Sequence, residues 1–173
     1  MAAQKKGLID DNWLSEKVLR QSTPQDVTQV FGSELYKLPD LVFDIRLPGQ
    51  PFRVAFEIER TRKAQMRYDG LVNAYAAASG VHLVLIAFND RSVFELIRGA
   101  ARRLHYPQER RPIAFCKISE LHNSWTNFPM MIGDQALGFE QYIENLKSLL
   151  QTTQKSVSDI ESEKESLFAV GAG

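Results

Sequence analysis

The chain has 173 residues, with 21 basic and 21 acidic side chains and a formal net charge of zero. A composition of 44% hydrophobic and 24% charged residues is typical of one globular domain, and the balanced charge means that a polyanion-binding surface must come from local clustering. No apolar run reaches membrane-spanning length and the start lacks a signal-peptide pattern, so we expect a cytoplasmic protein without membrane contact.

The first predicted element is a helix from about residue 10 to residue 20, which the sequence Asp-Asp-Asn at 10–12 would cap. Its core-facing residues would be Trp13, Leu14 and Val18. Glu16 on the same helix has two interpretations: a solvated glutamate, or a helper to an acidic site formed elsewhere. A weak pattern at 32–37 suggests a first strand.

Residues 38–60 predict a β-hairpin, because apolar and polar residues alternate on both sides of a Pro-Gly-Gln-Pro turn at 48–51. If Leu47 pairs with Phe52, counting back places Asp40 opposite Glu59. Glu57 then lies diagonal to Asp40 on the same face of the sheet.

Acidic side chains at those positions would lie roughly 5 Å and 7–8 Å apart and repel one another. A divalent cation would turn this repulsion into a binding site, since Mg²⁺ is commonly held by one or two carboxylates plus water and phosphate oxygens. Asp40, Glu57 and Glu59 are therefore the leading candidates for a functional site.

A crossover helix is predicted over about 63–79, where the apolar period becomes helical. Hydrogen-bonding and basic residues surround its start: Arg60, Arg62, Lys63, Gln65, Arg67 and Tyr68. Cations at a helix N-terminus are disfavoured by the helix dipole and call for an anion. That anion is either a phosphate backbone or the neighbouring Glu57 and Glu59.

The next predicted elements are a buried strand at about 81–88 and a helix that starts after Asp90. This second helix directs Arg98, Arg102 and Arg103 outward, within the densest positive region of the chain. Such a cluster is either a solvated surface or a set of phosphate contacts.

The last third of the chain gives a weaker pattern. We expect a short strand at 112–118 near the sheet edge, an irregular segment at 120–138 and an amphipathic helix to about residue 153. Cys116 lies in the apolar strand, which favours core packing over a nucleophile. We interpret 1–153 as one domain and 154–173 as a mobile or partner-bound tail, with the last helix and the tail available to a homodimer or protein partner.

Pro39-Asp40 before the first strand of the hairpin, Glu57-Ile58-Glu59 in the second, and then a helix and a buried strand resemble the core of PD-(D/E)xK nucleases. The tract EIERTRKAQMRY resembles replication-relaxation and plasmid-mobilisation proteins of that superfamily. The resemblance implies a restriction-endonuclease-like α/β fold with a mixed central sheet and flanking helices. It also implies Asp40 and Glu57 as ligands of Mg²⁺ or Mn²⁺. Glu59 replaces the lysine that the family motif places there, and Lys63 could reach back from the helix.

Three functions follow as hypotheses. The first is metal-dependent hydrolysis of DNA, with Asp40, Glu57 and the carbonyl of Ile58 as metal ligands and with Lys63 or Glu59 acting on the attacking water. The second is a non-catalytic DNA-binding accessory of plasmid transfer on the same fold. The third is a protein-interaction module.

Overall fold

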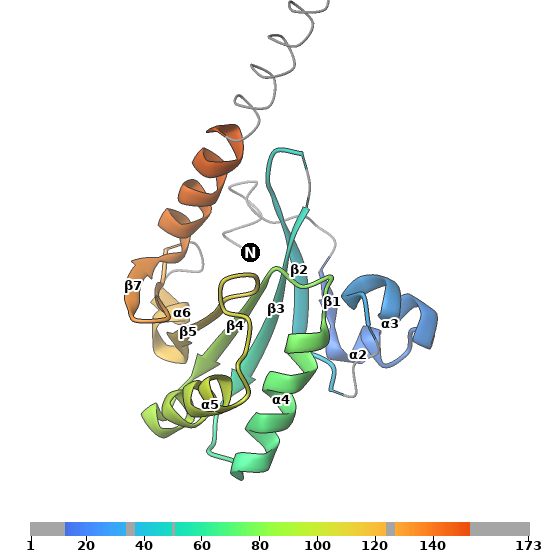
Figure 1. The fold of residues 1–173 in the computed structure, drawn as a ribbon, viewed down its shortest axis with the longest axis vertical. Coiled ribbons are helices and arrows are strands. Elements are labelled where there is room, and N and C mark those ends of the chain that lie inside the picture. The colour runs from blue at the N-terminus through green and yellow to red at the C-terminus, as the bar shows by residue number, and fades with distance from the viewer. Residues whose placement is uncertain (1–12, 34–36, 50, 124–126, 153–173) are drawn as a thin grey trace, which may run out of the picture.

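The computed structural model describes residues 13–33, 37–49, 51–123 and 127–152, and shows an α/β protein built on one open mixed sheet of seven strands (Figure 1). The strands follow one another along the sheet in chain order. They are β1 (Leu14–Ser15), β2 (Leu41–Arg46), β3 (Pro51–Glu59), β4 (Leu83–Phe88), β5 (Ile113–Lys117), β6 (Pro129–Ile132) and β7 (Gln135–Gly138). The two inner pairings, β3 with β4 and β4 with β5, are parallel, and the other four are antiparallel.

The predicted hairpin is confirmed, but its register differs by two residues from the expected one. Arg46 pairs with Pro51, and Leu41 pairs with Phe56. Counting on from the second pair places Asp40 opposite Glu57, whereas we predicted Glu59. A shift of two residues keeps every side chain on its expected face, because side chains alternate with a period of two.

Both crossover helices cover one face of the sheet. They are α4 (Gln65–Ala77), between β3 and β4, and α5 (Arg91–Arg103), between β4 and β5. Tyr68, Leu71 and Tyr75 of α4 pack with Val84 and Ile86 of β4 in a single buried cluster. This face also carries Glu57 and Glu59, which follow the core residue Ala55 at every second position of β3 and therefore point to the same side of the sheet.

The opposite face is covered by α6 (Ile118–Asn123) and by a helix over 139–152. Phe139 and Ile143 of that last helix are buried against Phe56 and Leu85 of the sheet. The predicted amphipathic helix is thus confirmed over the described residues, although Leu149 is 64% exposed and does not join the core.

Several sequence predictions were wrong in detail. Residues 10–12 of the expected helix at 10–20 lie outside the described residues, and the rest contains the strand β1 followed by the single turn α2 (Glu16–Leu19). Trp13 and Val18 are each 44% exposed, and Leu19 takes the core position instead. The helix α3 (Pro24–Phe31) follows and is held by a capping box between Thr23 and Asp26.

The C-terminal third is more regular than its sequence indicated. We expected an irregular segment at 120–138, but the residues described there belong mostly to α6 and to the β6–β7 hairpin. These strands extend the sheet beyond β5, so β5 is an interior strand and not near the edge. Cys116 on β5 is buried, and burial raises the pKa of its thiol to about 12, in keeping with core packing. The weak strand predicted at 32–37 and the tail at 154–173 fall partly or wholly outside the described residues.

Candidate functional site

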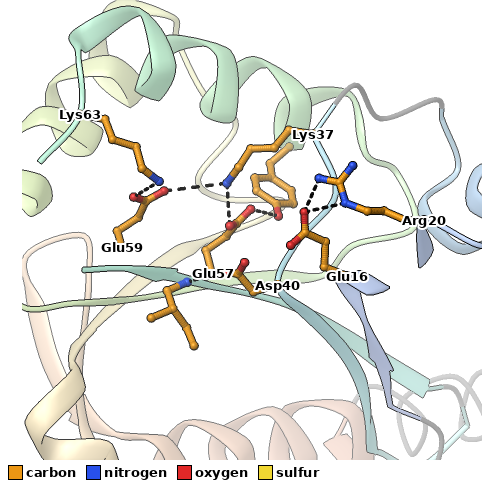
Figure 2. Close-up of polar contacts among 9 residues, drawn as sticks. Glu16, Arg20, Lys37, Asp40, Glu57, Glu59 and Lys63 are labelled. Carbon is orange, nitrogen blue, oxygen red and sulfur yellow. Dashed lines mark hydrogen bonds and ion pairs between the residues drawn. The ribbon is translucent and has the colours of Figure 1, made fainter. Parts of the chain in front are cut away.

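Acidic side chains gather at the carboxyl end of β3, beneath the start of α4. This is the edge where ligands of α/β sheets are usually bound. Glu57 and Glu59 are each 2% exposed, although most glutamates in proteins are solvated. Figure 2 shows the carboxylates of Glu16, Asp40 and Glu57 close together above the same face of the sheet. The structure therefore brings together the three predicted acids and the predicted helper.

Backbone hydrogen bonds hold Asp40 in this position. One carboxylate oxygen of Asp40 (Oδ2) accepts a hydrogen bond of 2.7 Å from the amide of Ile58, across the hairpin. The carbonyl of Asp40 accepts a hydrogen bond of 3.0 Å from the amide of Glu16. These contacts link Asp40, directly before β2, to the first residue of α2 and to β3, so its position is fixed from two sides.

Lys37 and Tyr75 contact the two oxygens of the buried Glu57 carboxylate. The ammonium of Lys37 lies 2.6 Å from Oε2, and the hydroxyl of Tyr75 donates a hydrogen bond of 2.6 Å to Oε1. Burial raises the pKa of Glu57 above its ordinary value of 4.5, and the charge of Lys37 opposes this change. Burial also raises the pKa of Tyr75 well above 10.0, so its hydroxyl stays a donor.

Glu59 is paired on two sides by lysines. The ammonium of Lys63 lies 2.6 Å from Oε2, and that of Lys37 lies 3.9 Å from Oε1. Lys63 thus reaches back to Glu59, and its proposed catalytic role stays a prediction. Lys63 precedes the helix rather than opening it, since α4 begins at Gln65.

The four acids Glu16, Asp40, Glu57 and Glu59 outnumber the three cations among the described residues that contact them, namely Arg20, Lys37 and Lys63 (Figure 2). Counting formal charges, four negative and three positive leave one negative charge in a site of which Glu57 and Glu59 are the buried members. Hard carboxylate oxygens with excess negative charge suit Mg²⁺ or Mn²⁺. By donor chemistry, then, the site fits such an ion.

The same side chains do not form a closed cage. Within the described part of the chain, no group of three or more His, Cys, Asp and Glu side chains is arranged to hold a metal ion. Mg²⁺ needs only one or two carboxylates from the protein, however, and completes its shell with water and phosphate. Asp40 and Glu57 would be those two, once the ammonium of Lys37 leaves Glu57.

The predicted DNA-binding residues divide into two groups. Arg60, Arg62 and Arg67 are exposed near the acids, as expected of residues that could contact a phosphate backbone. Gln65 is partly buried, and its amide donates a hydrogen bond of 3.0 Å to Asp69 within α4. The prediction for Tyr68 was wrong: it is 1% exposed, and its hydroxyl accepts a hydrogen bond of 3.0 Å from the amide of Lys63.

On α5 only Arg102 remains as expected, exposed and without an ion pair to another described residue. Arg98 forms an ion pair with Asp134, and Arg103 lies 2.6 Å from Asp69 of α4. Two of the three arginines therefore bind acids of the protein itself. Their role is at least partly structural, and α5 is a weaker candidate surface than the start of α4.

Sequence reasoning missed Lys37 and Tyr75. Lys37 lies in a stretch without a clear period, and Tyr75 lies in the apolar stripe of the predicted crossover helix, which indicates core packing only. The sequence did offer one signal for Lys37, namely the need of the predicted acids for a nearby cation. Buried acids require partners, and Lys37 is the nearest cation before Asp40 in the sequence.

Comparison with known proteins adds no family to this description: no family model, no curated protein and no solved structure matches the chain. No helix in the described residues is both long enough and apolar enough to cross a membrane.

Proposed function

We propose that the acidic site is the active site of a metal-dependent deoxyribonuclease with a restriction-endonuclease-like fold, of the replication-relaxation and plasmid-mobilisation type. One observation carries the proposal: Asp40 and Glu57 meet at the carboxyl end of β3, with the ammonium of Lys63 beside the neighbouring Glu59. The order of hairpin, crossover helix and parallel strand supports the fold assignment.

Asp40 and Glu57 would hold Mg²⁺ or Mn²⁺, with the carbonyl of Ile58 as a third ligand. When bound, such an ion lowers the pKa of water and neutralises charge on the phosphate oxygens. The hydrogen bond from the Ile58 amide already orients Asp40, whereas Glu57 must first release the ammonium of Lys37.

The remaining roles belong to Lys63, Glu59 and the nearby arginines. Lys63 would orient the attacking water and favour its deprotonated form, while Glu59 positions Lys63 through their 2.6 Å ion pair. Arg60, Arg62 and Arg67 would bind phosphates on either side of the scissile bond. Such contacts position DNA without reading its sequence.

The test is cleavage of supercoiled plasmid in Mg²⁺ or Mn²⁺ by the wild type and by Asp40→Ala, Glu57→Gln and Lys63→Ala, with DNA binding measured in parallel. We expect the first two variants to lose cutting by about 100-fold or more and to keep binding. Unchanged cutting by Glu57→Gln would remove the proposed site. Normal cutting by Lys63→Ala would remove only the role of Lys63.

A second candidate is a DNA-binding accessory without catalysis. It is favoured by the contacts of Glu57, whose two oxygens are both satisfied by Tyr75 and Lys37 without a metal ion. Under this alternative the acids are structural, and the wild type binds DNA but never cuts it. The absence of both binding and cutting would favour the third function, a protein-interaction module using the helix over 139–152, where Leu149 is exposed.

A further inference from the structure

A groove of about 960 Å³ opens next to the acidic site, between α2, α3 and the first turns of α4. Its volume is at the upper end of the range for small-ligand pockets, so it can accept more than a single small molecule. The groove shares Lys37 with the acidic site, because the same side chain lines the groove and contacts Glu57.

The lining of the groove is cationic at its rim. Arg20, Lys37 and Arg67 contribute to it, and none of the lining residues that the structure describes is acidic. Arg20 is paired with Glu16 and Lys37 with Glu57, so the charge that favours an anionic occupant is mainly that of Arg67. Arg67 makes no ion pair with another described residue, so its charge remains available.

Apolar side chains form the rest of the groove. Leu19 and Leu71, each 1% exposed, lie beneath it with Leu38 nearby, and Met66 is 81% exposed at its edge. The phosphates of a DNA backbone would not interact favourably with this apolar surface. A nucleobase would, since its flat face is apolar and is available in a strand that is not base-paired.

The first turn of α4 adds a further indication. Met66 and Arg67 belong to this turn and line the groove, yet the N-cap residue Ala64 offers no side-chain hydrogen bond to the free amides of the helix. A cation in a first turn is unfavourable unless an anion compensates it. A phosphate in the groove would provide that compensation.

We infer that the groove binds an unpaired DNA strand, with phosphates against Arg20, Lys37 and Arg67 and a base against the accessible apolar side chains of Leu38 and Met66. The inference rests on the proposed function in one respect: a strand in the groove passes Lys37 and leads directly to Asp40 and Glu57. The substrate would then be single-stranded DNA, or the single-stranded part of a branched DNA, rather than an intact duplex.

The test measures binding of a fluorescent oligothymidylate of about 12 nucleotides by anisotropy in EDTA, with the matching duplex as competitor. We expect the single strand to bind at least about fivefold more tightly than the duplex. Arg67→Glu should weaken binding by about tenfold or more, and the milder Arg67→Gln by less. Lys147→Glu is the matched control, because Lys147 lies on the helix that packs on the other face of the sheet.

The inference is wrong if Arg67→Glu binds as tightly as the wild type, if it loses no more affinity than Lys147→Glu, if the duplex binds better, or if no form binds. These outcomes are separate from those of the cleavage test. If the protein binds the single strand through Arg67 but does not cut DNA, the groove proposal is supported and the nuclease proposal is wrong. If the protein cuts DNA but Arg67→Glu does not change its affinity for the single strand, the nuclease proposal is supported and the groove proposal is wrong.

Discussion

The hydroxyl of Tyr75 on α4 donates a 2.6 Å hydrogen bond to Oε1 of Glu57 on β3, and both residues are almost completely buried. This contact ties the crossover helix to the strand that carries the acids. It also satisfies a carboxylate oxygen that has no access to water. The pair therefore matters for both stability and the electrostatics of the site.

Replacing Tyr75 with Phe should lower the free energy of unfolding by about 1–3 kcal/mol, because the buried carboxylate loses a hydrogen-bond donor. Urea denaturation measures the loss. Tyr142→Phe is the control: Tyr142 is only partly buried, and its hydroxyl forms no hydrogen bond with another described residue, so the change should be within about 0.5 kcal/mol. Equal effects of the two substitutions would argue against the role given to the Tyr75 hydroxyl.

The stability of the protein should respond to the charge of Glu57. Burial raises the pKa of this group above 4.5, so the native state binds the proton more tightly than the unfolded chain does. Its contribution to the free energy of unfolding is therefore fully present below pH 4.5 and falls as the pH rises through the raised native pKa.

Urea denaturation of the wild type and of Glu57→Gln between about pH 4 and pH 8 tests this sign. The difference, wild type minus variant, should become less favourable to the wild type as the pH rises. A difference that is constant with pH, or that grows in favour of the wild type, would show that the partners of Glu57 outweigh the effect of burial.

The ion pair of Lys63 with the buried Glu59 should contribute measurable stability. Lys63→Ala leaves that carboxylate with only the more distant ammonium of Lys37, and we expect a loss of about 1–3 kcal/mol in the free energy of unfolding. Lys147→Ala removes a pair with the exposed Glu144 and should change stability by less than about 1 kcal/mol. Chemical denaturation of both variants gives the comparison, and a larger loss for Lys147→Ala would contradict it.

A substitution at Gly80 tests the packing of this residue against the end of α3, a helix that also lines the groove. A Cβ at Gly80 would lie 2.5 Å from the carbonyl oxygen of Val30 and 2.9 Å from the carbonyl carbon of Phe31, so Gly80→Ala must displace the end of α3. We expect a loss of about 1–3 kcal/mol in the free energy of unfolding.

Gly133→Ala is the control for this substitution. Gly133 has a positive φ of 60°, but a Cβ at this position would meet no other atom within 4 Å. Only the backbone cost of about 1 kcal/mol should therefore appear. Thermal unfolding monitored by circular dichroism measures both variants. A smaller loss of stability for Gly80→Ala than for Gly133→Ala would mean that the end of α3 can move to accommodate the added Cβ.

The sequence predicted the features that a local residue pattern determines, and it did not predict the others. Alternation in the hairpin was sufficient to assign Glu57 and Glu59 to one face, because that depends only on a period of two. The register could not be derived in this way, since shifts of two residues give the same alternation. Asp40 therefore faces Glu57 and not Glu59, although all three acids still meet.

Contacts between distant segments were beyond the reach of these patterns. Lys37 contacts Glu57 although the two residues lie 20 positions apart in the sequence, and no periodicity encodes that contact. Arg103 was expected to be free, but it pairs with Asp69 because α4 and α5 lie side by side. The local pattern thus predicted which charged residues lie on the surface of a helix. Which of them form ion pairs depends on the tertiary arrangement.

The order of the strands has a consequence for how the protein reaches its native state. Every described strand pairs with the strands next to it along the chain, so no strand has to insert between two that are already joined. Loop-closure entropy is small for such connections, which favours rapid folding. Glu57 and Glu59 are buried only when α4 docks, so a nascent hairpin can keep both carboxylates hydrated until that step.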